Sequence, residues 1–159
     1  MDVIEEMKRY FGKDQKLVDH TLEVLEYAQK IMDKEHLDEK TKKIVTDAAV
    51  LHDIGVIEAR RKYGSSAGPY QEREGQIIAR SILEKIGRSS EEIDRVCFIV
   101  GHHHTPSAID GIDFQIVWEA DQIVNVKSKG LREEKENLDK YFKTSYGKQM
   151  LKEMIDKSI

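Results

Sequence analysis

An apolar run that ends in an adjacent histidine and aspartate constrains this chain more than any other feature. Residues 48–55 read Ala-Ala-Val-Leu-His-Asp-Ile-Gly. The small and apolar residues predict a buried helix that stops at Gly55. Burying an unpaired imidazole or carboxylate costs about 1–3 kcal/mol, and a bare charge costs far more. A divalent metal ion removes that penalty because neutral imidazole and ionised carboxylate both bind it. His52 and Asp53 are therefore candidate metal ligands.

Two further candidates lie on apolar stripes elsewhere in the chain. His20 is three residues after Leu17 and four before Val24, so its imidazole is expected to face the core. Asp121 lies within the apolar segment 114–124, which also predicts a helix. Each residue has a purely structural interpretation, as a histidine bonded to a backbone carbonyl or an aspartate bonded to a helix terminus or an arginine. The doublet that lies between them in the sequence favours metal ligands.

The order histidine, histidine-aspartate, aspartate, with the outer two on separate helices, resembles the HD superfamily of metal-dependent phosphohydrolases. The resemblance extends from about Lys16 to Val126. It implies a divalent ion held by four ligands, namely His20, His52, Asp53 and Asp121. This nitrogen and oxygen set suits Mn, Mg, Fe, Co, Ni or Zn and does not choose among them. The lack of a thiolate argues against a closed structural zinc site.

Three consecutive histidines, His102 to His104, follow the helix expected after Ser89. They cannot all point one way, so one or two are expected to face the site. In some branches of the superfamily, two histidines at this place help bind a second metal, together with a histidine near the start of the preceding helix. Here that position has no histidine: the nearby residues are Gln71, Glu72 and Glu74, and a carboxylate such as Glu72 is a substitute. His102 and His103 are therefore candidates for binding either a second metal or the substrate.

The resemblance implies hydrolysis of a phosphate ester by a metal-activated water that attacks phosphorus. Asp53 is expected to act both as ligand and as acceptor of the water's proton. Candidates for binding the phosphate are Lys16, one turn before the first histidine, and Arg60 and Arg61 in the segment 58–68. That segment is expected to be a loop, either a lid over the phosphate or an exposed connection.

A phosphomonoesterase that acts on a nucleotide or a similar small phosphate ester is the favoured function, ahead of a phosphodiesterase. Val56 stands where some HD phosphodiesterases have a lysine and some nucleotidases a glutamate, so the general acid or base and the substrate are left open. One alternative is a metal-containing regulatory module that binds a nucleotide without turnover, and another is a binuclear phosphodiesterase. A plain helical interaction protein would require every buried polar residue to have an unrelated partner.

Apolar spacings of three and four along most of the chain predict an all-α fold. We expect a single-domain helical bundle of the HD type over residues 1–159, with about six to eight helices. The metal-site core is expected over about 16–126 and two closing helices over 131–159. Asp14 is expected to cap the first long helix, and Asp113 the apolar helix that follows it.

Composition limits the partners and the compartment. The net charge of −4 argues against a nucleic-acid polymer as the main partner. The single cysteine, Cys97, excludes a disulfide within the chain and favours a cytoplasmic protein. No apolar run approaches the roughly 20 residues that a membrane span needs. A homodimer is an assembly that the sequence allows.

Overall fold

The computed structural model describes residues 2–130 and 135–157, which form nine α-helices, one short 3₁₀-helix and no strand. The prediction of an all-α fold is therefore confirmed. None of these helices is long and apolar enough to cross a membrane, within the described ranges. The elements are α1 (Val3–Phe11), α2 (Gln15–Asp33), α3 (Glu39–Leu51), α4 (Val56–Tyr63), α5 (Gly68–Lys85), α6 (Ser90–Val100), η1 (Pro106–Ala108), α7 (Ile112–Lys129), α8 (Lys135–Tyr141) and α9 (Ser145–Lys157).

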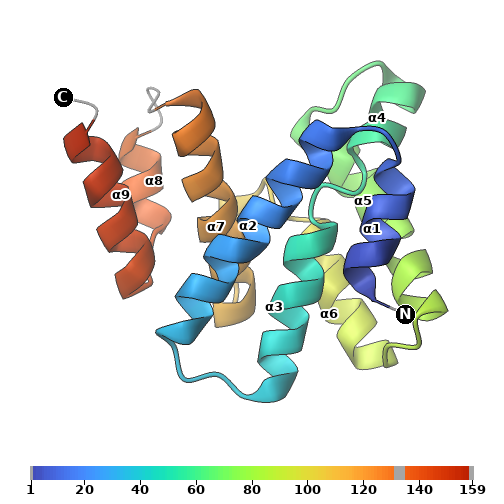
Figure 1. Cartoon of the computed structure of the whole chain (residues 1–159), viewed down its shortest axis with the longest axis horizontal. Helices are drawn as coiled ribbons and strands as arrows, with labels where there is room; N and C mark the ends of the chain where they lie inside the picture. Colours follow the sequence, from blue (N-terminus) through green and yellow to red (C-terminus); the bar gives the residue numbers. More distant parts are fainter. Residues whose placement is uncertain (1, 131–134, 158–159) are drawn as a thin grey trace.

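Helices α2, α3 and α7 pack against one another at the centre of the molecule (Figure 1). α5 and α6 form a second packed pair beside α3 and α4, and α1 contacts α2, α3 and α5. α8 and α9 lie on the other side, next to α7 (Figure 1). The interior is filled by fully buried side chains that include Met7, Ile31, Leu51, Ile99, Phe114 and Ile123.

Side-chain caps explain where several helices begin. Asp14 and Ser89 each accept a hydrogen bond from the backbone N–H three residues ahead, both at 3.2 Å, as their sequence positions predict. The prediction that Asp113 caps the next apolar helix is wrong. α7 begins one residue before it, and Gly111 occupies the cap position. Asp113 forms an ion pair with Arg95, which provides a stronger partner than a helix terminus.

The segment 58–68, expected to be a loop, is mostly helical. α4 covers Val56–Tyr63 and ends at Gly64, whose left-handed φ of 69° lets its N–H reach the Arg60 carbonyl. The basic run falls in the last turn of α4, where the helix dipole favours cations. The preceding helix also ends earlier than expected, at Leu51, and Gly55 leads directly into α4 instead of closing α3. Because α4 was expected to be a loop, the described residues form nine α-helices instead of the expected six to eight.

A buried carboxylate anchors the closing helices to α7. Glu119 is fully buried and accepts bonds from the backbone N–H groups of Lys143 and Thr144 at 2.7 and 3.1 Å. The Thr144 hydroxyl and the Gln115 side-chain amide also donate to it, at 2.5 and 2.6 Å. Glu119 thereby holds the start of α9 on the helix that carries Asp121.

The two closing helices are expected from residue 131, and residues 131–134 lie outside the residues that the structure describes.

We expect Glu119→Ala to lower the free energy of unfolding by about 2–5 kcal/mol, because buried backbone donors lose their acceptor. Urea denaturation followed by circular dichroism measures the change. Glu84→Ala is the matched control, since Glu84 is exposed on α5 and its side chain has no hydrogen bond or ion pair among the described residues. A loss below about 1 kcal/mol in Glu119→Ala would contradict the role as an anchor.

Candidate metal centre

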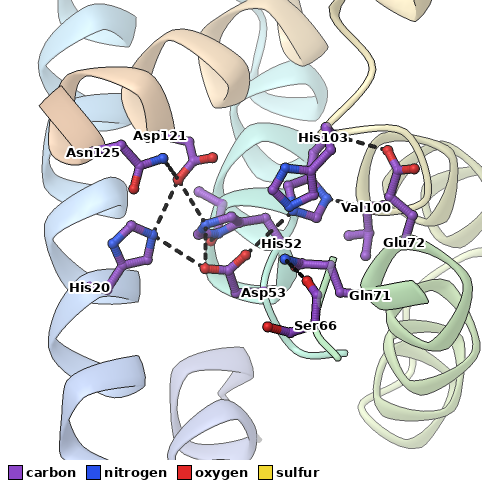
Figure 2. Close-up of polar contacts among 12 residues, drawn as sticks. His20, His52, Asp53, Ser66, Gln71, Glu72, Val100, His103, Asp121 and Asn125 are labelled. Atoms are coloured by element: carbon purple, nitrogen blue, oxygen red, sulfur yellow. Dashed lines mark hydrogen bonds and ion pairs between the residues drawn. The ribbon is translucent and has the colours of Figure 1, made fainter. Parts of the chain in front are cut away.

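Three helical segments bring two histidines and two aspartates together at one point (Figure 2). α2 supplies His20, the turn after α3 supplies His52 and Asp53, and α7 supplies Asp121. The Nε2 atom of His20 lies 3.2 Å from Asp121 Oδ1 and 3.3 Å from Asp53 Oδ2. The Nε2 atom of His52 lies 3.3 Å from the same two oxygens. The four residues that the sequence predicts as ligands thus present four atoms to one another.

The tautomer of His52 tests whether this cluster suits a metal ion. Its Nδ1–H donates to the Ala49 carbonyl at 2.7 Å, which leaves the lone pair on Nε2. Within the described part of the chain, that Nε2 atom is buried and has no hydrogen-bond partner, although it faces oxygens of Asp53 and Asp121. A lone pair directed at two carboxylate oxygens is repelled by them unless a proton or a metal ion lies between. The donor set therefore fits a divalent ion, with the second nitrogen of His52 fixing the ring as in other metal sites.

The electrostatics of the cluster favour a cation at the same place. Burial lowers the pKa of His20, but hydrogen bonds with Asp121 and Asp53 outweigh it and raise the pKa to about 9. Burial also opposes charge on His52, yet the two carboxylates raise its pKa well above the ordinary value. The attraction of His52 in turn holds the pKa values of Asp53 and Asp121 below the usual carboxyl range, despite burial. Because protons and metal ions compete for these lone pairs, metal affinity is expected to fall as the pH is lowered.

The second oxygen of Asp53 faces another pair of imidazoles. His103 is 1% exposed, and its Nδ1–H donates to the Val100 carbonyl at 2.7 Å. Its Nε2 atom is buried, has no hydrogen-bond partner in residues 2–130 and 135–157, and lies 3.4 Å from Asp53 Oδ1. Potential ligand atoms of Asp53, His103 and His104 lie within 4.8 Å of one another. His104 is more exposed than His103, but desolvation by the surrounding protein and the nearby His103 lower its pKa to about 4.

Other candidates from the sequence lie away from the cluster. The ring of His102 stacks on Phe98 with centroids 4.2 Å apart, and its Nδ1–H donates to the Phe98 carbonyl. Arg61 forms an ion pair with Glu58 on the exposed side of α4. Glu72 accepts hydrogen bonds from the loop that follows α6, at 3.0 and 3.1 Å. The structure therefore brings none of these three side chains into contact with the four predicted ligands.

A cleft of about 730 Å³ opens over the cluster. Two of the predicted phosphate-binding residues, Lys16 and Arg60, line it, and neither has an ion-pair partner among the described residues. The sequence interpretation did not select two further lining residues, His104 and Gln71. The sequence of three adjacent histidines does not show which ring faces the site, because helical spacing no longer applies after the helix has ended. A single glutamine is too common in proteins to indicate a functional site. The remaining lining residues include Leu17, Asp19, Glu23, Val56, Ser66, Val124, Asn125, Ser128 and Lys129.

Comparison with known proteins agrees with this arrangement. The family model of the HD domain matches residues 17–152, which is most of the chain. Searches of curated proteins and of solved structures found no match. HD domains bind divalent metals and are generally hydrolases. The match spans all four residues of the cluster, so the chain belongs to the HD-domain family of metal-binding hydrolases.

Proposed function

We propose that this protein is a metal-dependent phosphohydrolase that acts on a small phosphate ester, with a nucleotide monoester as the favoured substrate. The observation that carries the proposal is the cluster of His20, His52, Asp53 and Asp121 at the base of a cleft. The cleft is also lined by cations that have no ion-pair partner in the described part of the chain. The cleft volume of about 730 Å³ suits a ligand of nucleotide size.

The residues have separate parts in the proposed reaction. A bound divalent ion would polarise the phosphoryl oxygen and lower the pKa of the attacking water. Asp53 accepts the proton that the water loses, because its two oxygens reach both sides of the cluster. Lys16 and Arg60 bind the non-bridging oxygens of the phosphate and stabilise their negative charge.

The cations of the cleft favour a monoester. Three cations without ion-pair partners among the described residues line it, namely Lys16, Arg60 and Lys129. A phosphate monoester carries close to two negative charges near pH 7, whereas a diester carries one. Because the monoester has the larger negative charge, these three cations attract it more strongly than the diester, and the bound metal ion would offset the charge of Asp53 and Asp121.

A binuclear phosphodiesterase is the second candidate, and one contact favours it. His103 Nε2 and Asp53 Oδ1 are both acceptors, yet they face each other at 3.4 Å. A second cation would satisfy both atoms. A regulatory module that binds a nucleotide without turnover uses the same ligands and differs only in lacking activity.

Metal content and turnover measured together test these proposals. We expect about one ion per chain after reconstitution with Mn²⁺, and hydrolysis of nucleoside monophosphates that EDTA abolishes. About two ions per chain, one of them lost in His103→Ala, with faster hydrolysis of diesters, would favour the second candidate. Bound metal without hydrolysis of any ester would favour the regulatory module. If the protein bound none of Mn²⁺, Fe²⁺, Co²⁺ or Zn²⁺, all three candidate functions would be contradicted.

Adjacent arginines provide a matched test of phosphate binding. Arg60 lines the cleft, whereas Arg61 is paired with Glu58 outside it. We expect Arg60→Ala to lower kcat/KM by about 10- to 100-fold, the value of one or two charged hydrogen bonds. Arg61→Ala is expected to change it by less than about twofold. Equal losses in both variants would show that the effect comes from the net charge of α4.

A further inference from the structure

We propose that Gln71 is a positioning residue whose side-chain oxygen orients the attacking water. The proposal rests on the phosphohydrolase function given above. It assigns a part in the reaction to a residue that is neither a predicted metal ligand nor a phosphate-binding cation.

The side chain of Gln71 is held at one end and unsatisfied at the other. The residue is only 7% exposed, and its Nε2 donates to the Ser66 carbonyl at 3.3 Å. The opposite atom, Oε1, is buried and has no hydrogen-bond partner among the described residues. Buried side-chain acceptors are usually bonded, so an unpaired one needs an explanation. The bond to Ser66 also fixes which end of the amide is the acceptor.

The backbone places Gln71 directly beside the histidine-aspartate turn. An added Cβ atom at Gly55 would lie 2.4 Å from the Gln71 carbonyl oxygen, so the two backbone segments are in close contact. The side chain of Gln71 extends from the start of α5 toward Asp53 (Figure 2). Gln71, Asp53 and His104 line the same cleft. Gln71 is therefore held near the carboxylate that accepts the proton.

The chemistry of the surrounding groups restricts what Oε1 can bind. Phosphoryl oxygens are acceptors, as are the ionised carboxylates and the unprotonated nitrogen of His103. A partner for Oε1 must be a hydrogen-bond donor or a metal ion, and the donors Lys16 and Arg60 are assigned to the phosphate. The attacking water has two hydrogens, and two fixed acceptors are needed to direct its lone pair at phosphorus. Asp53 and Gln71 provide them, and a glutamine orients the attacking water in the same way in some GTPases.

The proposed step balances as follows. The water oxygen forms a bond to phosphorus while the bond from phosphorus to the ester oxygen breaks. One water proton passes to the Asp53 carboxylate, and the other remains on the transferred oxygen, hydrogen-bonded to Gln71. The leaving oxygen departs with its electron pair and takes a proton from solvent where its basicity requires one.

Steady-state kinetics with p-nitrophenyl phosphate test this role, because its leaving group has no hydrogen to donate to Gln71. In the Mn²⁺-loaded protein we expect Gln71→Leu to lower kcat by about 30- to 100-fold, with KM and metal content unchanged. Gln71→Glu retains an oxygen and is expected to stay within about fivefold of the wild type. Gln76→Leu is the control on the same helix, since Gln76 is exposed and outside the cleft.

Each alternative result would contradict a specific part of the proposal. Unchanged kcat in Gln71→Leu, or a higher KM alone, would remove the water-orienting role. Equal losses in the leucine and glutamate variants, with equal falls in Tm, would assign Gln71 to holding Ser66 in place. An inactive wild type would overturn the proposed function instead. A crystal structure of the Mn²⁺-loaded protein then decides on Gln71: we expect an ordered water about 2.6–3.2 Å from both Oε1 and an Asp53 oxygen, and direct ligation of the ion by Oε1 would contradict it.

Discussion

Replacing Gly55 with alanine is expected to lower the free energy of unfolding by about 3 kcal/mol or more. The backbone at Gly55 has φ −84° and ψ −6°, which alanine adopts without strain. The loss of stability therefore comes only from the lack of space for the added methyl group. The added Cβ atom would lie 2.4 Å from the Gln71 carbonyl oxygen and from the Gly75 amide nitrogen, and 2.8 Å from the Gly75 Cα atom. These are backbone atoms of α5, so the whole start of that helix would have to move.

Gly87→Ala is the matched control for this prediction. Gly87 has a positive φ of 81° but nothing within 4 Å of an added Cβ atom. Its substitution costs only the backbone strain, about 1–2 kcal/mol. Urea denaturation should therefore rank Gly55→Ala well below Gly87→Ala, and the Tm of Gly55→Ala should fall by about 6–12 °C. If Gly55→Ala were as stable as Gly87→Ala, α5 would accommodate the added methyl group at a cost of no more than about 1–2 kcal/mol, and the prediction would be wrong.

The contrast between these glycines shows what the sequence reveals about the fold. A glycine after an apolar helix reads as a helix cap, and Gly64 has that function at the end of α4. Gly55 has the same local sequence signal but serves a contact with a helix that begins 13 residues later. The close approach depends on how α5 packs, and periodicity within one segment carries no information about it.

The residues of the candidate site also differ in whether local sequence predicts their direction or only the folded structure shows it. His20 and Asp121 lie on buried helical stripes, so their inward direction follows from local spacing, and the structure brings both to the doublet. The histidine triplet comes after α6 has ended at Val100, where helical periodicity no longer fixes direction. The turn decides that His103 faces Asp53 while His102 stacks on Phe98. The position of the Gln71 side-chain oxygen, and the contacts between helices that are far apart in the sequence, could be found only in the structure.

Asp53→Ala is expected to have the largest effect on function, with loss of metal binding and a fall in kcat/KM of at least about 1,000-fold. Asp53 Oδ2 lies 3.3 Å from the Nε2 atoms of both His20 and His52. Its Oδ1 lies 3.4 Å from His103. Removing it leaves Asp121 as the only carboxylate among the four predicted ligands, with two imidazoles. It also removes the proposed proton acceptor, so the losses in binding and chemistry combine.

The helical content should survive this substitution, because alanine fits a turn whose side chain borders a polar cleft and leaves no large apolar void. Elemental analysis, circular dichroism and ester hydrolysis on one preparation separate the effects. Asp94→Ala is the control, since Asp94 is exposed and paired with Arg80 far from the cluster, and it should keep metal and turnover. Wild-type turnover in Asp53→Ala would refute the mechanism. Retained metal with lost turnover would limit Asp53 to proton transfer and assign ion binding to His20, His52 and Asp121.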